Sequence, residues 1–205
     1  MNRDCPSILH EKHHLEDSHV TPQITGIDSY RGIVLTDEKP SRSKTPFRSF
    51  VSLKAIKKNG KLLKKLQVVG VHAHHGSLAP GLLFLKRKYG IPLFVGFRGK
   101  DATAYPKNKE NLKKIKEVFR TADLFFPVCK HLKKQIVRLG CPKHKVRVLY
   151  GGVDLKRFES RMRTLEAGEP LRFLGIGRFV EKKGFSDLIR AFALFRKKKP
   201  NATLT

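Results

Sequence analysis

Hydrophobic positions change their spacing repeatedly between residues 68 and 150, from short continuous runs to a repeat of three or four residues. The continuous runs predict strands at residues 68–72, 93–97, 124–128 and 146–150. The repeats between them predict helices at residues 78–89, 108–120 and 130–139. Strands separated by helices of this length indicate βαβ units, so we expect a parallel sheet covered on both faces by helices.

The segments on either side of this region carry weaker patterns. Residues 1–25 show no periodicity, residues 32–35 predict a short strand, and residues 50–66 predict helix with a break near Gly60. Farther along, a polar and turn-rich stretch precedes a new apolar run that leads into another helix. We therefore expect a poorly structured N-terminus, a first domain, a linker and the first βα unit of an incomplete second domain, at residues 1–25, 26–158, 159–170 and 171–205.

The composition adds an unusually large positive charge. The chain has 44 lysines and arginines against 17 aspartates and glutamates, which gives a net charge of +27 at pH 7. The basic residues recur on the predicted helices, as expected either for solvated helix faces or for contact with an anionic membrane surface. No run of 18 apolar residues predicts a membrane span, the polar N-terminus does not resemble a signal peptide, and three separated cysteines indicate reduced thiols in the cytoplasm.

Histidines stand at the predicted end of the strand at residues 68–72, and ligands bind beyond such strand ends in open parallel sheets. His72 and His74 point to the same side of an extended chain. They could ligate a metal, form structural hydrogen bonds within a loop, or orient a hydroxyl group in a cleft. A metal would need a third ligand, and none stands at local spacing. The histidines near the N-terminus, His10, His13, His14 and His19, could also ligate a metal, but they too lack partners at ligand spacing.

Two further loops follow predicted strands. Arg98 and Asp101 come after the strand at residues 93–97, where Asp101 could line a cleft or simply cap its own turn. Gly151 and Gly152 follow the last predicted strand of the first domain and would permit positive φ or a close backbone approach. Asp154, just beyond them, could hydrogen-bond within its own turn.

The strongest candidate is the loop that opens the second βα unit. Gly177 and Arg178 follow its apolar run, and Lys183 precedes the predicted start of a helix. An arginine and a lysine in these places could hold a diphosphate group. The spacing matches neither a Walker loop nor a complete GxGxxG motif, and a solvated basic turn would have the same local sequence.

Taken together, four motifs resemble those of the family-4 glycosyltransferases, most closely those of colanic acid and exopolysaccharide biosynthesis. They occur in order over roughly residues 68–205 and read HAHHG, FRGKD, VCKHLKKQIVRLGCPKHKVRVLYGGVDLKRF and GIGRFVEKKGFSDLIRAFALF. The resemblance implies the GT-B fold, in which two Rossmann-like domains face a deep cleft. The fold class expected is thus α/β, with a Rossmann-like parallel-sheet N-terminal domain plus the first βα unit of an incomplete second Rossmann-like domain.

The resemblance also implies an activity. Members of the family transfer a sugar from a nucleotide-diphosphate sugar with retention of configuration, and they need no metal or other cofactor. The first domain would hold the acceptor, a saccharide or a lipid-linked saccharide, and the second would hold the donor. The enzyme would work in the cytoplasm, with peripheral contact at the inner face of the membrane.

Site residues follow from the same resemblance. His74 would lie near the reacting sugar, with His72 as the second choice, and Asp101 matches an aspartate that the family has in the same loop. Arg178 and Lys183 would contact the donor diphosphate beside Gly177. The remaining candidates would line the cleft or its hinge: Arg98, Gly151, Gly152 and Asp154.

Two departures from the family pattern limit these expectations. The family's Glu-x7-Glu segment, which binds the donor sugar and ribose, does not occur in this sequence, and neither does the glycine-rich first loop. We therefore expect a fragment that does not turn over alone. The alternatives are an inactive remnant of the acceptor domain that acts as a binding partner and, from charge alone, a nucleic-acid-binding protein. The aromatic residues fall at core positions and no nucleic-acid motif is present, so we expect no nucleic-acid partner.

Overall fold

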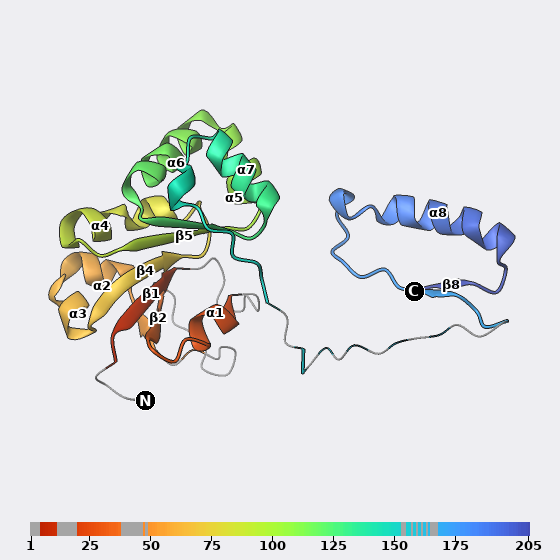
Figure 1. Cartoon of the computed structure of the whole chain (residues 1–205), viewed down its shortest axis with the longest axis horizontal. Helices are drawn as coiled ribbons and strands as arrows, with labels where there is room; N and C mark the ends of the chain where they lie inside the picture. The colour runs from red at the N-terminus through yellow and green to blue at the C-terminus, as the bar shows by residue number, and fades with distance from the viewer. Residues whose placement is uncertain are drawn as a thin grey trace. The chain divides into compact units, whose positions relative to one another are not determined.

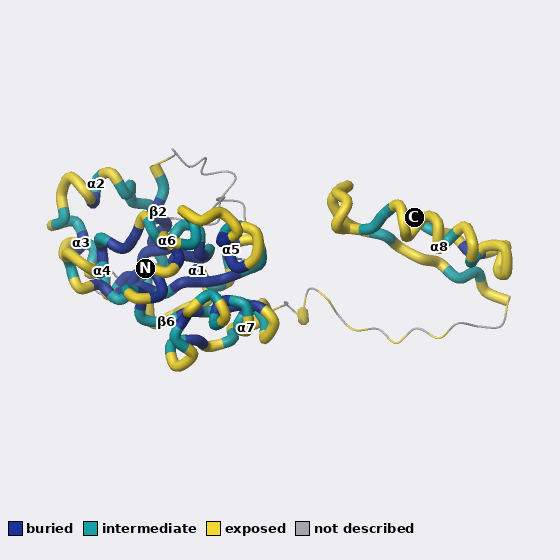
Figure 2. The backbone as a smooth tube through the Cα atoms, turned by 90° about the horizontal axis from the view of Figure 1, so that it is seen from above, coloured by how far each residue is buried: buried dark blue, intermediate teal, exposed yellow. Residues whose placement is uncertain are grey.

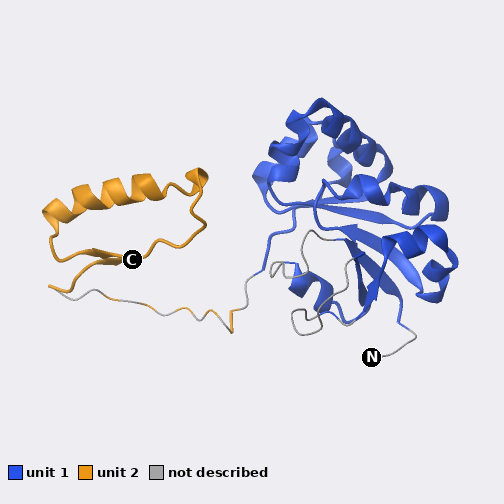
Figure 3. Ribbon diagram, turned by 180° about the vertical axis from the view of Figure 1, so that it is seen from behind, with its two compact units in different colours: residues 1–152 blue, residues 153–205 orange. Residues whose placement is uncertain are grey.

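The computed structural model describes residues 5–11, 20–37, 47, 49–152, 155–156, 158, 160, 162, 164 and 168–205. The chain divides into two compact units, residues 1–152 and 153–205 (Figure 3). Among the described residues, no helix combines the length and the apolar character needed to cross a membrane.

The first unit is built on a six-stranded sheet with strand order β3-β2-β1-β4-β5-β6 (Figure 1). Every neighbouring pair of strands runs parallel, as the alternation of strands and helices predicts. The order reverses between β1 and β4, which is where doubly wound sheets form their ligand crevice. The six strands are β1 Ser7–Glu11, β2 Arg31–Leu35, β3 Phe50–Val51, β4 Val68–Ala73, β5 Leu93–Phe97 and β6 Leu124–Pro127.

The helices cover the two faces of this sheet unequally. The main core lies on one face, where Ile56, Ile115 and Ile136 pack against alternate strand residues such as Val71 and Phe125. The opposite face carries a smaller cluster under α1, made of Val20, Ile24, Val34 and Phe47. Buried residues accordingly lie in the middle of the unit, and exposed residues lie on the outer surfaces of the helices (Figure 2). The helices are α1 Thr21–Thr25, α2 Leu53–Lys58, α3 Lys61–Lys65, η1 Ala79–Leu82, α4 Leu83–Tyr89, α5 Lys100–Thr103, η2 Tyr105–Lys107, α6 Lys109–Thr121, α7 Lys130–Arg138 and η3 Lys143–Lys145.

Local chemistry fixes where these helices begin and end. Helix α6 starts at Asn108, whose side-chain oxygen accepts hydrogen bonds from the N–H groups of Glu110 and Asn111 at 2.9 and 3.1 Å. Helix α4 ends at Gly90, which takes the left-handed conformation with φ of 69°. The predictions for β4, β5, β6, α4, α6 and α7 are confirmed to within a few residues.

Two elements differ from the sequence prediction. The segment at residues 1–25 contains β1, which pairs with both β2 and β4 and lies inside the sheet. Its apolar run is only Ile8 and Leu9, too short to show a period. Residues 146–150 were predicted as a strand, but in the structure they form only one isolated bridge, between Val146 and Phe125 of β6. The backbone N–H groups of Arg147 and Leu149 donate hydrogen bonds to carbonyl groups of β6. Two such bonds fall short of a regular ladder.

The second unit contains a single strand–helix–strand arrangement, as expected from the sequence. Strand β7 (Arg172–Phe173) pairs in parallel with β8 (Thr203–Leu204), and η4 (Glu181–Lys183) leads into helix α8 (Phe185–Lys198) between them. No residue of α8 is buried, although its sequence is amphipathic. The unit therefore has hardly any core of its own among the residues that the structure describes.

Candidate functional site

The carboxyl ends of β1 and β4 place three histidines side by side. His10 is the fourth residue of β1 and faces His72 of β4 in the parallel register. His74 follows β4 by one residue. Ala73 turns into the main core, so His72 and His74 project to the opposite side, as the alternation of an extended chain predicts. Their ring centroids lie 4.0 Å apart, and His10 lies 6.0 Å from His72 and 5.2 Å from His74.

His74 is fully buried and forms the polar centre of this group. Its Nε2 lies 3.0 Å from Nδ1 of His10, within hydrogen-bond distance. Arg98, from the loop after β5, donates from Nε to the carbonyl oxygen of His74 at 3.1 Å and from Nη2 to Oε1 of Gln23 at 2.9 Å. The structure thus brings Arg98 and His74 together, and it adds Gln23 of α1 to the same network.

Burial keeps two of these imidazoles neutral at physiological pH. It lowers the pKa of His10 to about 4. It also lowers the pKa of His72 to about 3, with smaller contributions from His10 and the positive charge of Arg98. Both rings can therefore act as hydrogen-bond acceptors or as ligands at pH 7.

A carboxyl group ends the same strand. Glu11 is the last residue of β1, and burial, helped by the negative charge of Asp37, raises its pKa to about 7. A carboxylic acid that titrates near neutral pH can give or take a proton. From the sequence, His10 was considered only with the other N-terminal histidines as a metal ligand without partners, and Glu11 was not a candidate, because the strand that carries them was not predicted.

Asp101 holds two strand-end loops together. Its carboxylate is almost fully buried and accepts hydrogen bonds from the backbone N–H groups of Arg98, Gly99 and Ala102 in its own loop, at 2.8 to 3.1 Å. It also accepts one from Gly76 in the loop after β4, at 3.0 Å. Of the two interpretations open from the sequence, this geometry favours capping, so Asp101 positions the loop that carries Arg98.

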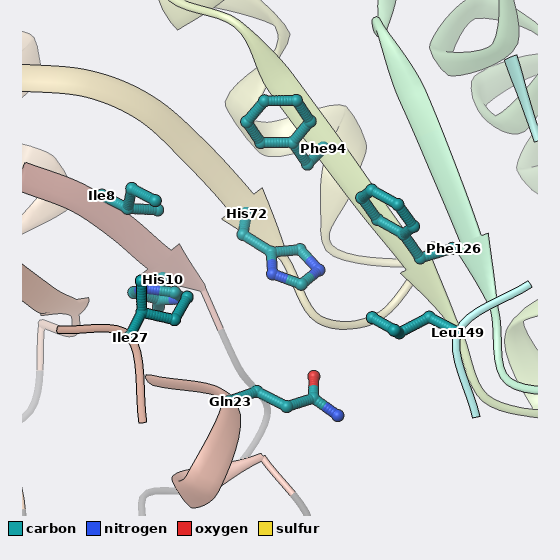
Figure 4. Close-up of a pocket in the computed structure, with 8 residues that line it drawn as sticks. All are labelled: Ile8, His10, Gln23, Ile27, His72, Phe94, Phe126 and Leu149. Atoms are coloured by element: carbon teal, nitrogen blue, oxygen red, sulfur yellow. The ribbon is translucent and has the colours of Figure 1, made fainter. Parts of the chain in front are cut away.

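A pocket of about 310 Å³ opens over the histidines (Figure 4). Its walls are mostly apolar, and its polar groups are Gln23 and the rings of His10 and His72, which face the same space in Figure 4. A partly apolar pocket with a few convergent polar groups at the switch point of a sheet has the character of a small-molecule site. The apolar residues are Ile8, Ile27, Phe94, Phe126 and Leu149.

The proposed hinge residues gain less support. Gly151 and Gly152 are exposed, neither takes positive φ, and a Cβ added to either would meet no atom within 4 Å. Neither residue therefore uses the positive φ or the close approach that glycine would permit, and their role at the cleft or its hinge stays a prediction. Asp154 lies outside the described residues.

The loop before α8 in the second unit carries the two predicted cations, Arg178 and Lys183. Lys183 directly precedes Gly184, which has φ of 64° and is the N-cap of α8. A Cβ on Gly177 would lie 3.6 Å from Cδ of Lys183, so these two residues are neighbours in space. Arg178 follows Gly177, and both cationic side chains are exposed. Such an arrangement, beside the N–H groups that begin a helix, can receive an anion.

Comparison with known proteins shows the family to which this chain belongs. Residues 17–157, more than half of the chain, match the model of Glycosyltransferase Family 4. Over 121 residues the chain is 29% identical to the amylovoran biosynthesis glycosyltransferase AmsK of Erwinia amylovora, an alignment that covers 59% of this chain and 29% of AmsK. It is 30% identical over 95 residues to WcaL of Escherichia coli, named provisionally as a colanic acid biosynthesis glycosyltransferase, covering 46% of this chain and 23% of WcaL. The chain thus spans less than a third of either relative.

A solved structure shares the fold at low sequence identity. HepE of Anabaena, crystallised with UDP, superposes with a TM-score of 0.69 at 13% identity, over 92% of this chain and 57% of HepE. Such a likeness shows the fold alone, and it confirms the GT-B type expected from the motifs. The chain belongs to glycosyltransferase family 4.

Proposed function

We propose that this chain supplies the acceptor-side domain and the start of the donor-side domain of a retaining hexosyltransferase for cell-surface polysaccharide. The observation that carries the proposal is the family match, supported by the exposed cations Arg178 and Lys183 in the loop that leads into α8. They would hold the donor diphosphate and stabilise the charge that builds up on it as the glycosidic bond breaks. The donor would be a nucleotide-diphosphate sugar, because HepE was crystallised with UDP-glucose.

The first unit would contribute the acceptor side. In this proposal the neutral pocket over His10 and His72 takes the acceptor, a saccharide or a lipid-linked saccharide, and His74 lies near the reacting sugar. Transfer would need no metal, because cationic side chains take over the neutralisation of the diphosphate. Arg98 and Asp101 would keep the loop beside His74 in place.

Donor binding tests the proposal directly. We expect Arg178→Ala and Lys183→Ala each to weaken binding of UDP-glucose by at least about tenfold, the loss of one charge-assisted hydrogen bond. Isothermal titration calorimetry would measure this. Lys197→Ala, in the last turn of α8, removes the same charge from an exposed position of the same unit and serves as the matched control. Equal losses in all three variants would show only that a very basic chain attracts an anion, and would contradict the proposal.

Turnover needs a second test, because the chain spans less than a third of AmsK. We propose that it is inactive alone and gains activity when mixed with the C-terminal half of a family relative such as AmsK. Sugar transfer from UDP-glucose, followed by chromatography of labelled product, would measure this. Transfer by the chain alone would contradict the inactivity, and no transfer in any mixture would favour a binding partner without enzymatic activity.

The positive charge points to the location of the reaction. We propose peripheral contact with the anionic inner face of the cell membrane, since the basic residues of α2, α3, α6 and α7 lie mostly on exposed helix surfaces. Vesicle sedimentation should show binding that requires anionic lipid and falls as salt rises. Binding that ignores salt, or no binding at all, would contradict this part of the proposal.

A further inference from the structure

The histidines at the switch point of the sheet form a second kind of site. His10, His72 and His74 come from two adjacent strand ends, and one ring nitrogen from each lies within 4.8 Å of the other two. This juxtaposition could not be read from sequence, because His10 and His72 are 62 positions apart. It supplies the third ligand whose absence argued against a metal at His72 and His74.

One nitrogen of this group is a buried polar atom without a partner. Within the part of the chain that the structure describes, Nε2 of His72 is buried and has no hydrogen bond. Leaving a polar group in this state is costly, so such atoms are rare unless a ligand or water completes their hydrogen bonds. The atom itself is shut off from solvent, and the ring that carries it lines the pocket (Figure 4).

The distances suit a tetrahedral ion of the zinc type. Zn²⁺ binds imidazole nitrogen at about 2.0–2.1 Å, which places tetrahedral ligand atoms about 3.4 Å apart. His10 Nδ1 and His74 Nε2 are hydrogen-bonded at 3.0 Å, so metal binding would move the proton between them to another ring nitrogen or to solvent and open the pair by a few tenths of an ångström. The longest separation in the group, 4.8 Å at most, would need to close by little more than 1 Å, within the reach of side-chain rotation.

We propose that His10, His72 and His74 bind a transition-metal ion of the Zn²⁺ class, with the fourth coordination position open to the pocket. Three imidazoles and an open position are a donor set that suits Zn²⁺, and it also accepts Co²⁺. Nη2 of Arg98 lies 3.5 Å from Nδ1 of His74. This positive charge and the net charge of +27 oppose a cation and weaken the site. The site is a binding property of the first unit that the proposed transfer does not use, and a bound ion would compete with the acceptor for the pocket over His10 and His72.

Metal binding to an untagged chain tests this inference. We expect one Zn²⁺ per chain by competition with a chromophoric chelator, and tetrahedral visible absorption when Co²⁺ takes its place. His72→Phe keeps an aromatic ring packed near Phe126, and it should weaken Zn²⁺ binding at least about 100-fold, more than the loss of an outer-shell contact would. His10→Ala and His74→Ala should do the same, with circular dichroism to confirm folding. If the alanine variants fail to fold, His72→Phe still decides, because Nε2 of His72 has no hydrogen bond to lose.

Two controls exclude other histidines. The exposed His131 of α7 provides a matched single variant, and a triple change of His13, His14 and His19 to alanine removes the remaining N-terminal histidines. Both should bind Zn²⁺ within about twofold of the unchanged chain. Octahedral Co²⁺ absorption, Zn²⁺ binding unchanged by His72→Phe, or binding lost with the triple variant would each overturn the proposal.

Discussion

The two units of the chain hold their strand-end loops in opposite ways. In the first unit, the loop after β5 is fastened by the buried carboxylate of Asp101, which accepts four backbone N–H groups. In the second, residues 174–183 run from β7 to α8 almost entirely exposed, and Ile176 and Phe179 have 84% and 89% of their surface accessible. One loop is shaped by the protein itself, whereas the other displays cations and apolar side chains to the solvent.

The same contrast extends to the helices. Helix α6 buries Ile115, Val118 and Phe119 against the sheet, while α8 buries none of its residues. Ile189 and Leu194 of α8 are 60% and 65% exposed. A single βα unit offers a helix only two short strands to pack against, so amphipathic sequence alone cannot bury it. The order of the first unit's site therefore comes from its core, and this can be tested residue by residue.

The largest effect is expected from the carboxylate that fastens the loops. Asp101→Ala should lower the free energy of unfolding of the first unit by about 3–5 kcal/mol, because it leaves buried N–H groups without an acceptor. Asp187 of α8 is exposed and contacts only Arg190, at 4.0 Å, among the ion pairs of the described residues. Asp187→Ala should therefore change stability by about 0.5 kcal/mol or less.

Urea denaturation can assign this effect to the first unit. All four tyrosines lie in residues 1–152 and the chain has no tryptophan, so tyrosine fluorescence reports that unit selectively. A loss below about 1 kcal/mol for Asp101→Ala would mean that the loop holds its shape without the carboxylate, and the contrast between the two loops would fail.

A slightly smaller effect is expected from one substitution made in both helices. Ile115→Ala in α6 removes a fully buried side chain and should cost about 2–5 kcal/mol. Ile189→Ala in α8 removes an exposed one and should stay within about 0.5 kcal/mol. Far-UV circular dichroism during urea denaturation would follow both helices. Similar losses of stability in both variants would show that α8 is packed in solution, and would contradict the contrast between α6 and α8.

The sequence predicted most of the sheet, because β4, β5 and β6 are apolar runs bounded by clear helix signals. It also predicted that His72 and His74 share one side of the chain, and that Lys183 stands at a helix start. It missed β1, whose place in the sheet depends on pairing with β2 and β4 rather than on its own five residues. With β1 it missed Glu11 and the contact of His10 with His72 and His74, since contacts between distant residues leave no local pattern.

The smallest effect concerns a thiol that reports when the first unit opens. Cys141 is 3% exposed within the main core, and burial raises the pKa of its thiol to about 12 from the ordinary 9.0. The thiol ionises at lower pH in the unfolded chain than in the folded one. The buried neutral thiol therefore adds fully to the free energy of unfolding below pH 9, and this contribution is lost as the pH rises toward 12. The loss should reach about 1–2 kcal/mol at pH 10. Cys141→Ala should remove this pH dependence, whereas Cys129→Ala, at a partly exposed thiol, should leave it.

Reactivity toward a thiol reagent extends the same comparison to the second unit. At pH 8 we expect Cys141 to react only when the first unit opens, because the reactive thiolate is both rare and enclosed. Leu194→Cys places a thiol on α8 at a position that is 65% exposed, and it should react at the rate of an unfolded peptide. Because opening of the first unit controls the slow reaction, Asp101→Ala should accelerate the labelling of Cys141 and leave that of the new thiol unchanged. Equal rates at the two thiols would show that the first unit has no more protection than the second.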